Sequence, residues 1–168
     1  RRVPDMALTT EHHEHYTIAL TNDGQWRRAW ELMEGPMRAD GLVPTCGSYI
    51  AVLAACSKEG QWQTAQFLLE DMQIRRASEL NKIGSPRMVK LHTKAFNLVL
   101  RALAQVRTQN GGNGSNGSID SVQWEACLDT LERMHNMTGV LPDTVSFNTV
   151  LTACARAGQW EAALEVFE

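Results

Sequence analysis

The sequence predicts an all-α protein, an α-solenoid of about four helix–turn–helix hairpins, on the basis of three observations. The tripeptide Gly-Gln-Trp occurs at Gly24–Trp26, Gly60–Trp62 and Gly158–Trp160, and a fourth Gln-Trp lies at Gln123–Trp124. The first two of these tryptophans are 36 residues apart, and so are the last two. In the two clearest units, apolar residues before and after the tryptophan recur at helical spacing. A fixed period of this length is typical of helical repeat arrays.

The two clearest units share one layout: a first helix, a glycine turn and a second helix. One face of the first helix repeats an aromatic residue, a valine, a leucine and a cysteine: Tyr49, Val52, Leu53 and Cys56, then Phe147, Val150, Leu151 and Cys154. Gly60 and Gly158 stand where a helix ends in a left-handed residue, and Pro44 and Pro142 precede the first helices. We expect one solenoid domain, part of a longer array, with hairpins at about 11–40, 46–76, 92–137 and 144–168.

The repeated tryptophans are interpreted as core residues. A tryptophan that opens the second helix can pack between the two helices, and the alanine one turn later, at Ala65 or Ala163, allows a close approach. We therefore expect packing roles for Trp26, Trp62, Trp124 and Trp160, and no stacking on a cofactor or a base.

Two segments interrupt the period. Gln109–Ser118 consists of glycine, asparagine, serine and glutamine, and it predicts a mobile loop at about 107–120 inside the third hairpin. Ala77–Leu91 lies between two hairpins and has room for a short helix.

The composition excludes several classes of protein. Apolar residues make up 43% and charged residues 21%, which is ordinary globular composition, and no apolar run is long enough for a membrane span. Four cysteines are too few for a disulfide-stapled scaffold, which favours a reducing compartment, and the lack of a Cys-x-x-Cys argues against a zinc ribbon. The sequence also lacks a phosphate-binding glycine loop and a zinc-deaminase motif. We therefore expect no enzyme, no cofactor and no metal; His12 and His15 are interpreted as part of a solvated helix start.

Positive charge is concentrated in the middle of the chain. Between Ile74 and Arg107, eight basic residues accompany the single acid Glu79, although the whole chain has a net charge of −3. The basic residues are Arg75, Arg76, Lys82, Arg87, Lys90, Lys94, Arg101 and Arg107. Such asymmetry suggests an anionic partner, with phosphate as the obvious candidate. The alternative is a solvated segment whose charges do not converge.

Three segments carry a resemblance to a known repeat family. Leu141–Leu151 reads Leu-Pro-Asp-Thr-Val-Ser-Phe-Asn-Thr-Val-Leu, Lys94–Leu100 has a similar Phe-Asn start, and Val43–Ile50 matches more weakly. The Pro-Asp-x-x-Ser-Phe-Asn start resembles that of pentatricopeptide repeats and is absent from tetratricopeptide repeats. The resemblance covers roughly residues 11–168, and it is poorest in the first unit, where His13–Ile18 departs from the pattern.

The resemblance implies an RNA-binding site. Members of the family are mostly organellar proteins that bind single-stranded RNA on the concave face, one base per repeat. Carried over to this chain, Asn97 and Asp143 form the one complete base-reading pair, in a combination that implies uridine. Asn148 has the first place of such a pair in the last repeat. Val145 matches the residue that sandwiches bases, whereas Lys94 replaces it in the preceding repeat. Lys94 and Arg101 lie on the same predicted helix and would flank the groove.

Some of these residues also have a purely structural interpretation. Asparagine near a helix start and aspartate after proline are ordinary capping choices, so Asn97 and Asp143 can serve packing alone. Ile50 with His92 is outside the readable combinations of the family and is expected to select no base.

Two functional hypotheses follow. The first is a protein of the chloroplast or mitochondrion that binds single-stranded RNA for processing, stability or translation. The second is a non-catalytic architectural subunit or adaptor of a large organellar complex, such as a ribosome, in which the solenoid contacts other protein subunits. Four hairpins with one complete reading pair, two insertions and acidic ends favour the second hypothesis, whereas the family favours the first.

Overall fold

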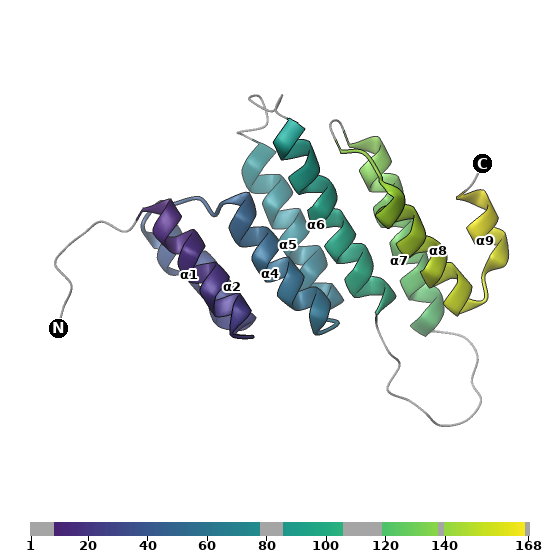
Figure 1. Cartoon of the computed structure of the whole chain (residues 1–168), viewed down its shortest axis with the longest axis horizontal. Helices are drawn as coiled ribbons and strands as arrows, with labels where there is room; N and C mark the ends of the chain where they lie inside the picture. Colours follow the sequence, from purple (N-terminus) through teal and green to yellow (C-terminus); the bar gives the residue numbers. More distant parts are fainter. Residues whose placement is uncertain (1–8, 78–85, 106–118, 138–139, 167–168) are drawn as a thin grey trace, which may run out of the picture.

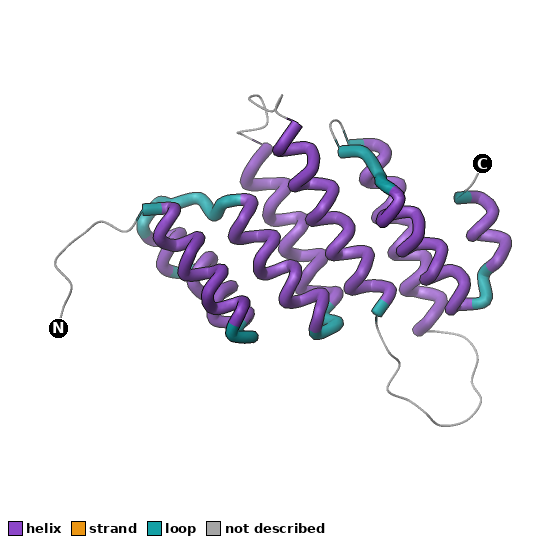
Figure 2. The backbone as a smooth tube through the Cα atoms, in the orientation of Figure 1, coloured by secondary structure: helices purple, strands orange, loops and turns teal. Residues whose placement is uncertain are grey.

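The computed structural model describes residues 9–77, 86–105, 119–137 and 140–166 (Figure 1). The helices in chain order are α1 (Thr10–Asn22), α2 (Trp26–Glu34), α3 (Pro36–Ala39), α4 (Cys46–Lys58), α5 (Trp62–Ala77), α6 (Pro86–Ala104), α7 (Ile119–Asn136), α8 (Thr144–Ala157) and α9 (Trp160–Glu165). No strand occurs in the described ranges, where helices alternate with short loops (Figure 2). The predicted all-α solenoid is confirmed.

The hairpins stack side by side in two layers. The first helices α1, α4, α6 and α8 form the front layer in Figure 1, and α2, α5 and α7 lie behind them. Each first helix packs against the next, so that one row of contacts runs through the layer. The second helices α2, α5 and α7 each pack against the first helix of their own hairpin and against that of the next. In the described residues, no comparable row joins the second helices to one another.

Three of the first helices begin with the same capping arrangement. Thr45 accepts a hydrogen bond from the backbone N–H of Ser48, and Asp143 accepts one from Ser146. Thr9 caps α1 in the same way, with His12 as its partner three residues later. The caps at Thr9 and Asp143 are reciprocal, and all three satisfy N–H groups that the first turn leaves without a partner. They also define equivalent positions, counted from each cap, along the layer.

The glycine turns form as predicted. Gly60 has a φ of 68° and Gly158 a φ of 72°, which is the left-handed conformation that glycine adopts without a steric penalty. After each glycine, the N–H of the glutamine donates to the carbonyl of a cysteine five residues back, Cys56 or Cys154, at 2.9 Å. These bonds close Schellman motifs and turn the chain into the second helix.

Helix α6 begins earlier than the sequence pattern indicates. The third hairpin was predicted to start at about residue 92, but α6 starts at Pro86. Proline suits this first helical position because its ring presets φ and the missing N–H would have no helical partner there. The predicted loop at Gln109–Ser118 lies outside the described residues.

The core runs between the two layers, and its tryptophans differ in burial. Trp26 is 7% exposed, and its indole N–H donates to Glu59 at the end of α4, in the next hairpin. Trp62 and Trp124 are partly buried and pack against the core. Trp160 is 66% exposed, so the prediction of a packed residue is wrong there. The tryptophan of a second helix is buried by the following hairpin, and among the described residues α9 packs on α8 alone.

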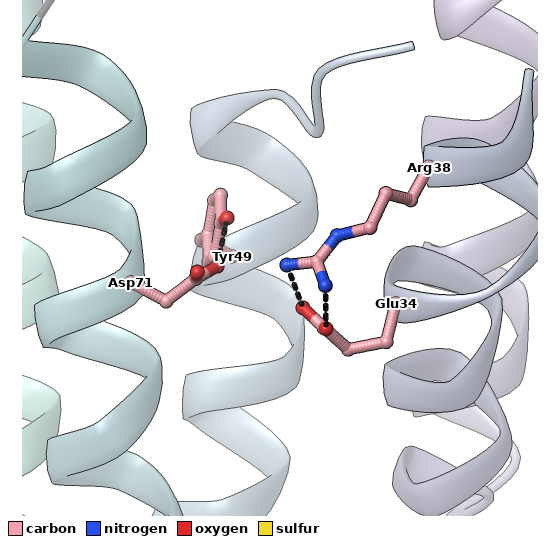
Figure 3. A network of polar contacts seen from close by, with 4 residues as sticks. All are labelled: Glu34, Arg38, Tyr49 and Asp71. Atoms are coloured by element: carbon pink, nitrogen blue, oxygen red, sulfur yellow. Dashed lines mark hydrogen bonds and ion pairs between the residues drawn. The ribbon is translucent and has the colours of Figure 1, made fainter. Parts of the chain in front are cut away.

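Two polar contacts lie close together, one within each of the first two hairpins (Figure 3). The hydroxyl of Tyr49 donates to Asp71 at 2.6 Å, which ties α4 to α5. Beside them, Arg38 and Glu34 form an ion pair at 3.0 Å between α3 and α2. Burial raises the pKa of Asp71, whereas the hydrogen bond from Tyr49 lowers it. The charges of Glu34 and Arg38 raise and lower this pKa respectively, and the net effect is a rise.

All four cysteines are free and buried. Burial raises the pKa of Cys56 to about 12, and it does the same for Cys127. Both side chains are therefore neutral thiols that act as packing residues. Among the described residues, no helix combines the length and the apolarity that crossing a membrane would require.

Candidate nucleic-acid interface

The junction between α6 and α8 brings Asn97 and Asp143 together. Asn97 lies in α6, and its side-chain Nδ2 donates a hydrogen bond to Oδ1 of Asp143 at 3.0 Å. Asp143 is the N-cap residue of α8. A second bond across the same junction, from the hydroxyl of Thr93 to the carbonyl of Leu141 at 3.2 Å, fixes the loop that carries Asp143. The two residues are 46 positions apart in the sequence, and the stacking of neighbouring hairpins brings their side chains together.

Ser146 is the third member of this cluster. Its Oγ lies 2.6 Å from Oδ1 of Asn97 and 3.1 Å from Oδ1 of Asp143. The backbone N–H of Asp143 donates to the same Oγ at 3.1 Å, and the N–H of Ser146 donates to Asp143 at 2.9 Å. Ser146 is fully buried, whereas Asn97 is half-buried and Asp143 is exposed.

These contacts hold Asp143 in its ionised form. Partial burial raises the pKa of Asp143, but hydrogen bonds from the Ser146 backbone, the Asn97 amide, the Ser146 hydroxyl and the Val145 backbone outweigh it. The net effect is a lowered pKa, because donors aimed at a carboxylate favour its charged form. At neutral pH, Asp143 is an acceptor only.

An open groove of about 360 Å³ lies beside this cluster, between α6 and α8. It is lined by Arg101, Ala104, Gln105, Val145, Asn148, Thr149, Thr152 and Arg156. The lining contains two guanidinium groups and no carboxylate. Such a groove favours an anionic group, and phosphate oxygens match the planar donor pattern of arginine.

Both arginines are held by hydrogen bonds that leave donors available. Arg156 donates from Nη1 to the carbonyl of Ala104 at the C-terminal end of α6, at 2.7 Å. In the amide orientation that satisfies both neighbours, Gln105 accepts from Nε of Arg101 at 3.1 Å and donates to Ser57 at 2.8 Å. A guanidinium has five N–H donors, so each arginine keeps several for a ligand.

The other predicted site residues lie on the same layer. Val145 is 57% exposed and lines the groove together with Asn148. Lys94 is exposed on α6, one turn before Asn97, and is not part of the groove lining. The structure thus brings Arg101, Val145 and Asn148 together in one groove and places Asn97 and Asp143 in the adjoining cluster. The structure does not describe the side chains of the other basic residues between Arg75 and Arg107.

The first two junctions carry different chemistry at the equivalent positions. Asn148 lies five residues after its N-cap Asp143, and the same place holds Glu14 in α1 and Ile50 in α4; Asn97 corresponds to it in the repeat pattern of α6. The Glu14 carboxylate lies directly against Gly47, where it would meet any added Cβ. An acid and an apolar side chain therefore occupy the front layer of the first two hairpins. The polar cluster and the groove lie between the last two hairpins, at the junction of α6 and α8.

Sequence reasoning missed Ser146, Gln105 and Arg156. The signal for Ser146 was present, because Asp-x-x-Ser before an apolar run predicts a capping pair. Its contact with Asn97 depends on a hairpin stacking that no local pattern specifies. Arg156 stands at the end of its helix, where a basic residue is an ordinary choice, and only the geometry shows it reaching α6. Among the described residues, no three histidine, cysteine, aspartate or glutamate side chains gather as a metal site would require.

The layered stack of hairpins defines an α-solenoid protein built of helical repeats. The family model of the PPR repeat matches residues 47–76 and 145–168, which are the α4–α5 hairpin and most of the α8–α9 hairpin. These two hairpins are thus similar to pentatricopeptide (PPR) repeats, a family whose members generally bind RNA. No curated protein matches it.

Proposed function

We propose that this chain binds single-stranded RNA along its layer of first helices and reads one base at the α6–α8 junction. The observation that carries the proposal is the Asn97–Asp143 hydrogen bond of 3.0 Å beside a groove lined by Arg101 and Arg156. The amide offers polar groups to a base, while the arginines offer charge to the phosphates. Base contacts give sequence preference, whereas phosphate contacts give affinity.

The proposed base is uridine. An amide has both a donor and an acceptor, and so has the pairing edge of a pyrimidine. Asp143, held ionised, orients the amide from behind. The exposed Val145 offers an apolar surface against which a base can stack, and Lys94 is placed on the same helix to contact the RNA backbone.

We propose a non-catalytic role in a chloroplast or mitochondrion, in RNA processing, stability or translation. The support is the match of two hairpins to the PPR repeat, together with a site that holds amide, hydroxyl and guanidinium groups suited to binding. Expression of the full-length gene product with a C-terminal fluorescent tag tests the location. Signal in the cytosol alone would contradict it.

Base preference tests the role of Asn97. Each U of a single-stranded oligonucleotide is replaced in turn by another base. Replacement at one position, and at no other, should weaken binding to the wild-type protein. Asn97→Ala should lose about fivefold or more of this preference, since a bidentate base contact is worth about 1–3 kcal/mol, and it should keep most of the overall affinity. Fluorescence anisotropy at about 50 mM salt measures both. Undetectable binding there would reject RNA binding, because phosphate contacts are strongest at low salt.

Salt dependence tests the groove. Arg101→Gln and Arg156→Gln should weaken binding to all sequences alike, and each should reduce the slope of log K against log salt by about 0.7, the value for one phosphate contact on a single strand. The matched control is the pair Arg27→Gln and Arg28→Gln, exposed arginines on α2 away from the groove. Equal slopes for the groove and control variants would remove the groove from the interface.

A second candidate function is that of an architectural subunit in a large organellar complex. Phe147, Trp160 and Leu164 on α8 and α9 are 39%, 66% and 56% exposed, and exposed apolar side chains of this size favour contact with a protein partner. Purification from the native source separates the candidates. Bound RNA that is protected from nuclease favours the first, whereas stoichiometric protein subunits without RNA favour the second.

A further inference from the structure

We infer that Ser146 is a positioning residue that fixes the orientation of the Asn97 amide, and so sets which pyrimidine the junction accepts. This inference rests on the proposed function of Asn97 as the base-reading residue. It concerns a side chain that is fully buried and does not itself reach the RNA.

Three residues form a closed ring of hydrogen bonds. The N–H of Asp143 donates to Oγ of Ser146 at 3.1 Å, and that hydroxyl donates to Oδ1 of Asn97 at 2.6 Å. Nδ2 of Asn97 donates to Oδ1 of Asp143 at 3.0 Å, which closes the ring. The Ser146 hydroxyl also lies 3.1 Å from Asp143, but its single proton is best placed on the shorter bond to Asn97.

The direction of the ring is set by groups that cannot reverse. A backbone N–H can only donate, and an ionised carboxylate can only accept. The amide must therefore turn its nitrogen to the Asp143 carboxylate, and its oxygen then faces the Ser146 hydroxyl, which lies closer to that oxygen, at 2.6 Å, than to the carboxylate, at 3.1 Å. Hydrogen bonds in such a chain polarise and strengthen one another. A flip of the amide would break two bonds at once and place like groups face to face.

A fixed amide can distinguish uracil from cytosine. Uracil carries a hydrogen on N3 and needs an acceptor there, whereas cytosine has a lone pair on N3 and needs a donor. An amide that flips freely satisfies either base in turn, but an amide held in one orientation presents a single atom at a given place. With the ring intact, Asn97 keeps one N–H and one oxygen lone pair for the base, in a fixed order.

Ser48 provides the matched control. It has the same place in the capping arrangement of α4, is fully buried, and lies 3.1 Å from the hydroxyl of its N-cap Thr45. The residue equivalent to Asn97 at that junction is Glu14, a carboxylate whose two oxygens are alike, so there is no orientation to fix. Ser48→Ala and Ser146→Ala both remove a buried hydroxyl three residues after an N-cap residue, and the Ser146 hydroxyl also contacts the side-chain amide of another helix and the N–H of its N-cap residue.

The experiment measures the ratio of affinities for two oligonucleotides that differ by U or C at the position that Asn97→Ala identifies. Ser146→Ala should reduce this ratio about three- to tenfold, the range for losing one neutral hydrogen bond. Ser146→Thr, which retains the hydroxyl, and Ser48→Ala should keep the wild-type ratio. A wild-type ratio in Ser146→Ala would overturn the inference.

A second measurement needs no RNA. The side-chain NH₂ signals of Asn97, assigned by their loss in Asn97→Ala, should be protected from solvent exchange in the wild type and in Ser48→Ala, and should lose that protection in Ser146→Ala. Unchanged protection in Ser146→Ala would overturn the inference. Lost protection in a chain that binds no RNA would uphold the positioning role and reject the proposed function instead.

Discussion

At the scale of single residues, two aspartates show opposite effects of their surroundings. Asp143 receives several donors, and its pKa is lowered despite partial burial. Burial raises the pKa of Asp71, and the nearby Glu34 raises it further. The hydrogen bond from Tyr49 lowers this pKa but does not cancel the rise. A lowered carboxyl pKa stabilises the fold above the pKa of the unfolded chain, and that stability is lost as the pH falls through the folded value. A raised carboxyl pKa destabilises the fold at pH values above the folded pKa, and this penalty disappears as the pH falls below the pKa of the unfolded chain.

Asp71→Asn should therefore be slightly more stable than the wild type at pH 7, by less than about 1 kcal/mol, because asparagine can still accept from Tyr49 without carrying a charge. The advantage should vanish below about pH 4, where the wild-type carboxyl is protonated as well. Urea unfolding followed by circular dichroism at both pH values measures the difference. Tyr49→Phe, which removes the same hydrogen bond, should instead cost about 1 kcal/mol at both pH values. A loss of stability in Asp71→Asn at pH 7 would contradict the assignment.

At the scale of helices, the tryptophans show how much burial depends on a neighbouring hairpin. Trp26→Ala should cost about 3–5 kcal/mol, the range for removing a buried large aromatic side chain. Trp160→Ala should cost less than about 1 kcal/mol, because its side chain is two-thirds exposed. Urea unfolding of the same chain with each change provides the comparison. Equal losses would show that α9 is packed in solution.

Most of the helical structure could be predicted, because the signals for helices are local. The apolar spacing, Gly60 and Gly158 at the turns, and the prolines before α4 and α8 all lie within one hairpin. The exposure of Trp160 could not be predicted from its own helix, since the neighbouring hairpin decides it. The early start of α6 at Pro86 was missed because the residues between Pro86 and His92 continue no repeat pattern.

For the site, the sequence indicated the pair but not its environment. Asn97 and Asp143 are brought together, as the resemblance implied. The hydroxyl of Ser146 and the anchoring of Arg156 on α6 depend on how neighbouring first helices pack, to which the repeat period gives no guide. Local patterns specify which residues a junction contains, whereas the direction of its hydrogen bonds follows from three-dimensional contacts.

At the scale of the whole molecule, a stack in which each hairpin contacts its neighbours should be least stable at its ends. Backbone amides in α4 and in the described part of α6 should exchange with deuterium more slowly than those in α1 and α9, because the inner helices are packed on both sides. Hydrogen exchange followed by mass spectrometry measures this gradient. Uniform protection along the chain would show that the array unfolds as a single cooperative unit.

The unbroken row of contacts through α1, α4, α6 and α8 also has a mechanical consequence. When such a stack bends, the layer of first helices, which stay in contact, keeps its length. The second helices, which form no such row, move apart or closer together. Side chains carried by the first helices therefore keep their separation while the curvature changes. Asn97 and Asn148 lie at corresponding places of the repeat pattern on α6 and α8, which are neighbours in this layer. The distance between these two asparagines therefore stays constant while the layer of second helices moves.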